Sequence, residues 1–396
     1  MHDPESTDAR TTLPLAGLIA VEVGDSASAP FAGQILAGLG VEVWKVERPV
    51  TGDSTRSWGP KSCKGSAAAF HALNRGKKSL CLDIKDGADL AALHEFIVAR
   101  ADIFLHNLRP GSAARYGLDP ASLREGKPGL VCCEIGAYGH VGAMNRLPGY
   151  DPLMQAFAGI MSVTGEEGRQ PVRAGVSVND SGTGMWAVIG ILAALATRAR
   201  TGTGATVNSS LLETAISWMS TNIACLAADG DPGRRYGSGT ATVVPHRAYA
   251  AADGHIAVSC ANDRLFAKLS DVLGHPQWAR DPRFATNPAR IENRAAIDGL
   301  IETQLARASR EHWQARLAAV GVASAPVQTT SEIVAHAQTA ALQILQSPAA
   351  DELALVGLPL SFDGRRPPPL SAAPRLGEHN ALLRAALLPI KIQETQ

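Results

Sequence analysis

Short β-branched runs alternate with helical stretches in the first part of the chain, and this alternation constrains the fold more than any other feature. The extended runs are residues 18–23, 41–46, 79–82, 103–106 and 130–135, with helices expected at 30–39 and 89–101. Strands separated by helices of this length form βαβ units, whose strands are parallel and whose helices cover both faces of the sheet. The sequence therefore predicts an α/β fold with a Rossmann-like large domain.

The glycines near the second extended run do not form a dinucleotide-binding loop. Gly38 and Gly40 precede a strand, whereas the fingerprint loop follows a strand and opens a helix. We therefore expect a Rossmann-like fold that does not bind NAD.

Changes in composition divide the chain into three ranges. We expect residues 13–228 to form the N-terminal part of the large domain and 229–330 to form a small α+β domain with its linkers, followed by a third range, 331–396. The small domain is expected to have strands at 247–251 and 255–259, with helices at 263–273, 293–308 and 310–320. A last helix is expected at 380–388.

Charge and composition argue against several classes of protein. Lys+Arg and Asp+Glu both number 37, whereas a nucleic-acid-binding protein carries a basic surplus. The longest apolar run, 185–196, is interrupted by Gly190 and is too short for a membrane span, and residues 1–10 do not resemble a signal peptide. None of the six cysteines forms a CxxC pair or lies at zinc-site spacing. We expect a cytoplasmic protein with reduced cysteines, no metal, and neither a nucleic-acid nor a membrane partner.

A long apolar helix is expected at 180–197, introduced by Asn179, Asp180 and Ser181. These residue types favour helix N-caps. The free N–H groups of a helix start favour an anion there and would stabilise an oxyanion. An Asp with a reference pKa of about 3.9 is ionised at neutral pH and needs no partner base to act as a nucleophile. From these residues alone, a structural cap and a catalytic carboxylate both remain open.

Eight strings, in order along nearly the whole chain, carry a resemblance to one known family. They are PLAGLIAVEV, APFAGQILAGLGVEVWKVERP, GDSTRSWGP, NRGKKSLCLDIK, HNLRPGSAARYGLD, LPGYDPLMQAFAGIMSVTG, GVSVNDSGTGMWAVIGILAAL and LGEH. The chain resembles the class III CoA-transferases, a superfamily that also contains the α-methylacyl-CoA racemases. The resemblance implies that residues 331–396 return to the large domain, which is built from both ends of the chain. It also implies an interlocked homodimer, with each active site between the large domain of one subunit and the small domain of the other.

The resemblance also implies the chemistry. Asp180, in NDSGTGM, would attack an acyl-CoA and pass the CoA through an aspartyl anhydride and an aspartyl-CoA thioester to a small carboxylic acid. CoA is then a substrate, and no tightly bound cofactor is expected. CoA contacts are implied at Ser26, Ala27, Ser28, Arg48, Leu82, Lys85, Asn107 and Arg115. These residues lie at or just after strand ends, where open α/β sheets bind ligands, although each cation could be a solvated surface charge.

Departures from the family pattern bear on the substrate. In the racemase branch a His stands where this chain has Tyr150, and a Tyr with a pKa near 10 cannot replace that base at neutral pH. The resemblance places Asp151 beside Asp180 and Trp58 in the acyl pocket, and both could instead be structural. The string SASAP, residues 26–30, replaces VLAGP or VQAGP, so the chain has Ala27 where some transferases place a Gln.

The segment 237–246 resembles the dicarboxylate-using transferases, which usually end it in Tyr or Phe where this chain has His246. A distal carboxylate would need an Arg, and Arg173, Arg247 and Arg56 are candidates. The predicted reaction moves CoA, from succinyl-CoA in our expectation, to itaconate, mesaconate, citramalate or glutarate. A racemase-type isomerase, a formyl- or acetyl-CoA:oxalate CoA-transferase, and a catalytically silent CoA-binding protein are the alternatives.

Overall fold

A computed structural model of the chain describes residues 12–61, 65–349 and 353–387. Cys63 and the last residue of the C-terminal helix expected at 380–388 lie outside these residues. The chain divides into two compact units. The larger contains the described parts of 1–158, 175–220 and 338–396, and the smaller contains 159–174 and 221–337. Segments 159–174, 221–228 and 331–337, which the sequence ranges assign to the large domain, thus lie in the smaller unit.

The larger unit has a six-stranded parallel sheet in the order β3-β2-β1-β4-β5-β6. The strands are β1 (Ile19–Val23), β2 (Glu42–Glu47), β3 (Lys78–Cys81), β4 (Ile103–His106), β5 (Val131–Gly136) and β6 (Thr206–Ser210). The strand order reverses between β1 and β4, where Val23 pairs with His106. Sheets of this kind bind ligands at the carboxyl ends of the strands beside such a switch point. The α/β fold class and five of the strands confirm the sequence predictions.

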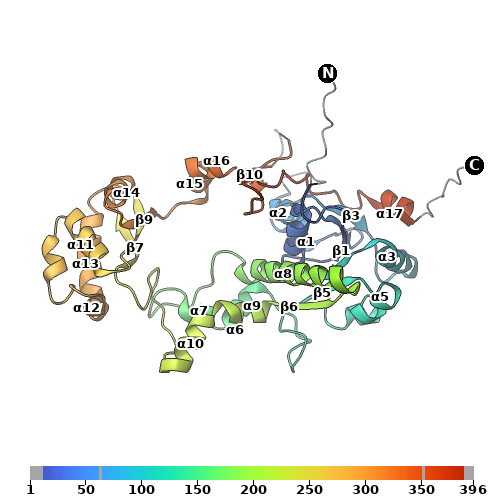
Figure 1. The fold of residues 1–396 in the computed structure, drawn as a ribbon, viewed down its shortest axis with the longest axis horizontal. Coiled ribbons are helices and arrows are strands. Elements are labelled where there is room, and N and C mark those ends of the chain that lie inside the picture. Colours follow the sequence, from blue (N-terminus) through green and yellow to red (C-terminus); the bar gives the residue numbers. More distant parts are fainter. Residues whose placement is uncertain (1–11, 62–64, 350–352, 388–396) are drawn as a thin grey trace, which may run out of the picture. The chain divides into compact units, whose positions relative to one another are not determined.

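Alternating side chains of the strands build one hydrophobic cluster on each face of the sheet. Val43 and Leu105 pack with helices α1 (Ser28–Gly38) and α8 (Val178–Thr201). Their neighbours Trp44 and Phe104 pack on the opposite face with α3 (Gly87–Arg100), α5 (Pro120–Gly126) and α17 (Asn380–Leu387). Figure 1 shows α1 and α8 together on one side of the strands and α3 and α5 beyond them. The carboxyl ends of the strands therefore meet the starts of α1 and α8.

Shorter elements complete the larger unit. They are η1 (Ser54–Ser57), α2 (Ala68–Asn74), α4 (Ser112–Arg115), α6 (Asp151–Phe157), α9 (Leu211–Trp218), β10 (Leu345–Gln346) and β11 (Leu355–Val356). Strand β6 was not expected, because its sequence TVNSS is mostly polar.

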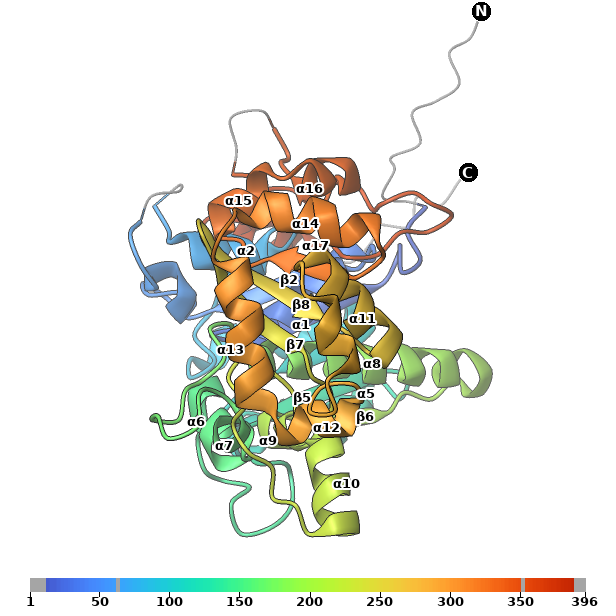
Figure 2. The ribbon, with the colours of Figure 1, turned by 90° about the vertical axis from the view of Figure 1, so that its left-hand side faces the viewer.

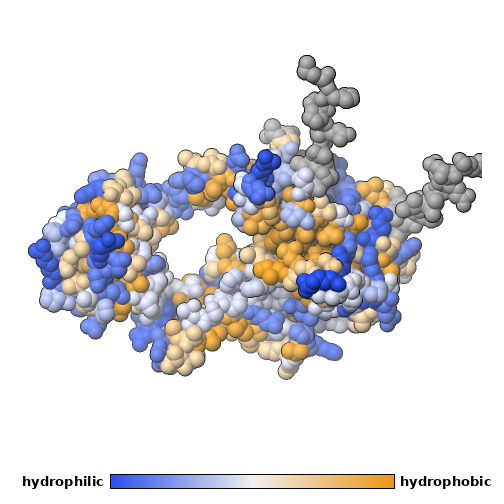
Figure 3. All heavy atoms as spheres, viewed as in Figure 1, coloured by the Kyte–Doolittle hydropathy of each residue, from blue (hydrophilic) through white to orange (hydrophobic). Residues whose placement is uncertain are grey.

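Helix α8 is longer than the sequence predicted and continues through Gly190. By length and composition it could cross a membrane, although 44% of its most apolar window is buried inside the chain. Its packing on the sheet explains the buried part, and Met185, Trp186 and Ile189 remain about half exposed. Figure 3 shows hydrophobic surface over the region of the larger unit where α8 runs.

The smaller unit has an antiparallel sheet of β7 (His246–Ala251), β8 (Gly254–Ser259) and β9 (Ala323–Pro326). Figure 2 shows helices packed around β7 and β8. The helices of the smaller unit and its borders are α7 (Ile160–Val163), α10 (Ser220–Asp229), α11 (Asp263–Val272), η2 (Pro276–Arg280), α12 (Asn287–Glu292), α13 (Arg294–Leu305), α14 (Arg310–Ala319), α15 (Thr330–Ala335) and α16 (Ala337–Leu342). Tyr249, Phe266 and Ile301 lie in its own hydrophobic cluster.

Candidate active site

Asp180 lies in the first turn of α8, and a second carboxylate caps that turn. Asp151, the first residue of α6, accepts the backbone N–H of Asn179 at 2.6 Å and that of Asp180 at 3.2 Å through Oδ2. Its other oxygen accepts a hydrogen bond from Gln155 at 2.5 Å. The actual N-cap residue, Ser177, makes no side-chain capping bond. The prediction that Asn179, Asp180 and Ser181 supply the cap is therefore wrong, because α6 supplies it through space.

This arrangement also corrects the expectation that the helix start stabilises an oxyanion. The N–H groups of Asn179 and Asp180 bond to Asp151, and those of Val178 and Ser181 bond to the carbonyls of Val176 and Ser177. The N–H groups of the first turn are thus already engaged. A developing oxyanion would need other donors.

The surroundings make the ionised form of Asp180 costly. Burial, and then the negative charge of Asp151, raise the pKa of Asp180 from 3.8 to about 7. A raised pKa in a carboxylate that keeps partial access to solvent is typical of functional sites. A carboxylate of higher basicity is also a stronger nucleophile, while a substantial fraction remains ionised at neutral pH.

Close backbone contact brings the start of α8 to the start of α1. A Cβ atom on Gly184 would lie 2.8 Å from the carbonyl oxygen of Ser28 and 3.2 Å from the nitrogen of Ala32. Gly184 is one turn after Asp180, so the glycine allows the first turns of both helices to meet. Asp180 therefore lies at the end of the larger unit that also carries Ser26, Ala27 and Ser28.

Three predicted CoA residues converge on Asp25, which the sequence analysis did not name. Asn107 donates to the carbonyl of Asp25 at 2.7 Å and accepts its N–H at 3.0 Å. The Asp25 carboxylate accepts the N–H of Ser26 at 2.8 Å and pairs with Arg48 at 2.7 Å. It also accepts both the N–H and the hydroxyl of Ser54, at 2.8 and 2.6 Å. An isolated Asp in a loop gives no signal of such a role in the sequence.

The other predicted CoA residues are spread around the same strand ends. Ala27 and Ser28 are buried where α1 begins, and Leu82 is buried after β3, so its side chain is not available to a ligand in this conformation. Lys85 and Arg115 are exposed, in the turn after β3 and at the end of α4.

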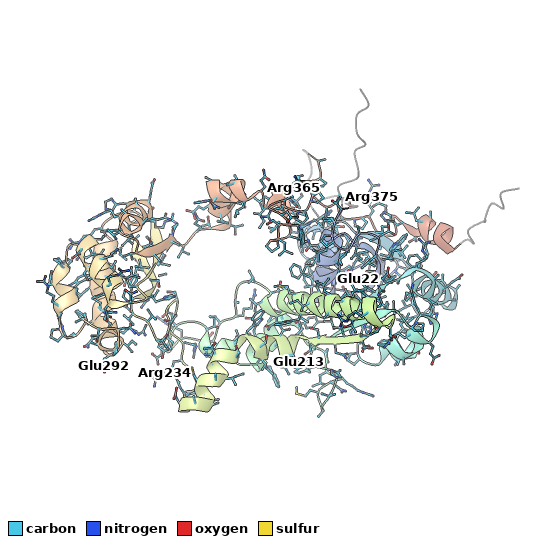
Figure 4. The ribbon with its side chains drawn as sticks, in the orientation of Figure 1. Glu22, Glu213, Arg234, Glu292, Arg365 and Arg375 are labelled. Atoms are coloured by element: carbon cyan, nitrogen blue, oxygen red, sulfur yellow. The ribbon has the colours of Figure 1, made fainter. Side chains whose placement is uncertain are left out.

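A buried group of charges lies beneath these loops and was also not expected. Lys45 Nζ is 2.8 Å from both Glu22 Oε1 and Asp53 Oδ2, and Lys77 Nζ is 2.7 Å from Glu22 Oε2. Figure 4 labels Glu22 in the larger unit. Burial lowers the pKa of Lys77 to about 8, whereas for Lys45 the effect of burial is outweighed by Glu22 and Asp53, which raise its pKa. The sequence did contain a signal for this group, because Glu22 and Lys45 are charged residues within otherwise apolar strand segments.

The same group holds the segment that carries Trp58. Asp53 caps η1 by accepting the N–H of Thr55 at 2.8 Å. Glu47 binds Arg56 through two bonds of 2.7 Å, and the guanidinium of Arg56 also stacks 3.6 Å from the ring centre of Phe70. Arg56 is therefore a structural residue, which argues against its predicted role with a distal carboxylate. Trp58 is half exposed directly after this anchored turn.

Tyr150 precedes Asp151 and is 63% exposed, at the start of α6.

In the smaller unit, Arg247 lies 3.6 Å from Asp298 and packs against the ring of Tyr249, so its charge already has a partner. Arg173 is exposed and donates to the neighbouring carbonyl of Ala174.

His246 is exposed on β7, and its Nδ1 lies 2.8 Å from Ser259 Oγ on β8. Among residues 12–61, 65–349 and 353–387, no group of three or more His, Cys, Asp or Glu side chains could hold a metal ion.

Comparison with known proteins gives one consistent result. The profile of CoA-transferase family III matches residues 15–380. The succinate–glutarate CoA-transferase of Agrobacterium fabrum is 33% identical, over 96% of this chain and 96% of that protein. The acetyl-CoA:oxalate CoA-transferase of Acetobacter aceti is 33% identical, over 96% and 97%. A crystal structure of a CAIB/BAIF family protein from Brucella suis superimposes with a TM-score of 0.87 at 36% identity, over 95% of this chain and 99% of that one. The chain therefore belongs to CoA-transferase family III and is a class III CoA-transferase.

Proposed function

We propose that this enzyme transfers CoA from succinyl-CoA to a short dicarboxylate through a covalent intermediate on Asp180. The observation that carries the proposal is the position of Asp180, in the first turn of α8 beside Asp151, with a pKa raised to about 7. A carboxylate of this kind is a competent nucleophile that needs no base. The similarity to a succinate–glutarate CoA-transferase supports the choice of substrates.

The proposed cycle has four steps. Asp180 attacks the thioester carbonyl of the donor, the C–S bond breaks, and an aspartyl-acyl anhydride and CoA thiolate form. The thiolate attacks the Asp180 carbonyl carbon, which releases the donor acid and leaves an aspartyl-CoA thioester. The acceptor carboxylate attacks this thioester to form a second anhydride and thiolate. The thiolate then attacks the acceptor acyl carbon and restores ionised Asp180, so no net proton transfer is required.

CoA itself is a strong anion, and we infer that it binds across the switch point of the larger unit. Arg48, Lys85 and Arg115 would provide cations, while Ser26, Ala27, Ser28 and Asn107 would provide the loops after β1 and β4. Leu82 would contribute only its backbone in this conformation. The support is their position at the strand ends, where sheets of this order bind ligands.

We infer roles in binding the acceptor acid for Trp58, Tyr150 and Asp151 of the larger unit, and for Arg173 and His246 of the smaller unit. Arg173 is our candidate for the distal carboxylate, because Arg56 and Arg247 are each paired with a carboxylate. Oxalate is the second candidate acceptor, since an acetyl-CoA:oxalate CoA-transferase is as similar to this chain as the succinate–glutarate enzyme, at 33% identity.

A homodimer and a cytoplasmic location also belong to the proposal. Half-exposed apolar side chains along α8, among them Met185 and Trp186, form a surface suited to contact with another chain. Buried thiols such as Cys133, whose pKa burial raises, suit a reducing compartment.

The decisive experiment is the mass of the intact protein after incubation with succinyl-CoA. We expect an adduct of CoA on the wild type and none on Asp180→Ala. A panel of succinate, glutarate, itaconate, mesaconate, citramalate, malate, oxalate and formate, tested against succinyl-CoA and acetyl-CoA, then identifies the acceptor. Exchange of an α-proton with deuterated water in the absence of an acceptor acid, without any adduct, would favour the isomerase alternative.

A further inference from the structure

Asp25 lies at the switch point and connects four separate segments of the larger unit. Its backbone exchanges two hydrogen bonds with Asn107, so it fixes the loop after β1 to the loop after β4. Its carboxylate fixes η1 through Ser54 and the end of β2 through Arg48. Arg48, Ser54 and Asn107 lie 23, 29 and 82 positions from Asp25 in the chain, and Asp25 is their shared contact.

The backbone next to Asp25 has a conformation that the surrounding contacts impose on it. Ser26 has φ +68°, a left-handed conformation that non-glycine residues seldom adopt. Its N–H is held by the Asp25 carboxylate, and its hydroxyl lies 3.3 Å from that of Ser54. Strained backbone of this kind persists where surrounding contacts determine it, and it concentrates at functional sites.

The ion pair between Asp25 and Arg48 orients the Arg48 guanidinium more than it stabilises the fold. The two side chains are 63% and 40% exposed, and exposed pairs contribute at most about 1 kcal/mol to folding. One nitrogen of the guanidinium contacts Asp25 at 2.7 Å and the carbonyl of Gly52 at 3.4 Å. The guanidinium is thereby held at the strand end while much of the side chain stays exposed to solvent.

We propose that Asp25 is a positioning residue for CoA, which orders the loop at Ser26 and orients Arg48 toward a phosphate of the ligand. The inference rests on the proposed CoA site, and it makes Asp25 act through its neighbours, without contact to the reacting atoms. Asp25 would thus assist the binding of CoA although its carboxylate, like CoA, is negatively charged.

Direct titration of CoA by calorimetry tests the proposal without turnover. Asp25→Ala should weaken CoA binding about 10- to 100-fold, the loss expected from several charge-assisted hydrogen bonds. Asp25→Asn should weaken it less, because an amide oxygen still accepts the bonds from Ser26 and Ser54. The KM for the acceptor acid should stay within about twofold, and kcat at saturating acyl-CoA within about threefold.

A double-mutant cycle of Asp25→Ala with Arg48→Gln tests whether Asp25 orients Arg48 for CoA or only stabilises the fold. Arg48→Gln should weaken CoA binding in the wild type and have much less effect in Asp25→Ala, because the two residues act as one unit. Asp281→Asn, which removes the carboxylate of a 2.7 Å pair with Arg283, is the matched control and should leave CoA binding unchanged.

Additive effects in the cycle, or wild-type affinity for CoA in Asp25→Ala, would overturn the proposal. Equal losses in all kinetic constants together with a lower melting temperature would reduce Asp25 to a structural residue and overturn it as well. If Asp180 formed no adduct while Asp25→Ala still lost CoA affinity, the transfer mechanism would fail and the role of Asp25 would stand.

Discussion

The carboxylate of Asp151 lies 3.2 Å from the backbone nitrogen of Asp180, so one acid caps the helix turn that carries the other. A cap normally stabilises a helix by about 1 kcal/mol. Here it also brings a negative charge close to a half-buried carboxylate, and burial together with this charge raises the pKa of Asp180. The same contact therefore orders the first turn of α8 and increases the basicity of the side chain that we propose as the nucleophile.

The first prediction concerns the pH dependence of transfer. Because only ionised Asp180 attacks the thioester, kcat/KM for acyl-CoA should fall as pH decreases through about 7, the pKa of this group. Asp151→Asn removes the neighbouring charge and should move this acid limb to lower pH. Asp86→Asn, at the exposed cap of α3, is the control. An acid limb that stays in place in Asp151→Asn would show that Asp151 does not tune Asp180.

The second prediction concerns stability. The pKa of Asp180 is raised on folding, so its contribution to stability is fully present below about pH 3.8 and is lost as pH rises through about 7. Asp180→Asn carries no buried charge. Its free energy of unfolding should therefore exceed that of the wild type by about 2–4 kcal/mol at pH 8.

That advantage of Asp180→Asn should shrink toward zero at pH 4, and thermal or urea unfolding at both pH values measures it. A pH-independent difference between the two proteins would contradict the assignment of this pKa to Asp180.

The sequence was sufficient to predict five of the six strands of the parallel sheet in the larger unit. Runs such as 103–106 and 41–46 are short, apolar and bounded by turns, so their strand character is local, and the structure confirms them. Strand β6 was not predicted, because its sequence TVNSS is mostly polar. It lies at an edge of the sheet, where several of these side chains remain partly exposed. Strand β3 lies at the other edge of the sheet and was predicted, so the polar sequence of β6, more than its edge position, explains why it was missed.

The site could be predicted only in part. Asp180, Ser26, Arg48 and Asn107 were named from resemblance, and the structure brings the last three together. Asp25 was missed, because its contacts reach residues 29 and 82 positions away in the chain. Through-space partners of this kind leave no periodic pattern to read.

The third prediction tests the buried charges that support the loops. Gly33 lies in the interior of α1, and a Cβ atom there would be 2.0 Å from Glu22 Oε2. Gly33→Ala should displace Glu22 from Lys45 and Lys77 and cost about 3 kcal/mol or more in unfolding free energy.

Gly299→Ala, inside α13 where the added Cβ would meet open space beyond the helix's own backbone, is the matched control. It should stabilise the protein by up to about 1 kcal/mol, since alanine favours helix. Equal effects of the two substitutions on urea unfolding would show that Glu22 adjusts without cost.

The last prediction concerns the acceptor acid. Arg56 is bound to Glu47 and Arg247 is paired with Asp298, whereas the side chain of Arg173 is exposed and bonds the adjacent carbonyl of Ala174. If Arg173 holds the distal carboxylate, Arg173→Gln should raise the KM for a dicarboxylate such as glutarate about 10- to 100-fold, the loss of one charge-assisted pair. The KM for acetyl-CoA as the donor and for a monocarboxylate such as formate as the acceptor should change little, because neither carries a distal carboxylate.

Arg169→Gln, an exposed Arg on the same segment, controls for a general loss of positive charge and should leave the KM for dicarboxylates unchanged. Steady-state kinetics of the wild type and the two variants distinguishes the two Arg residues. Equal increases for glutarate and formate in Arg173→Gln would mean that Arg173 acts on the attacking carboxylate or on the fold of its segment. Chain-length selection would then depend on another part of the pocket.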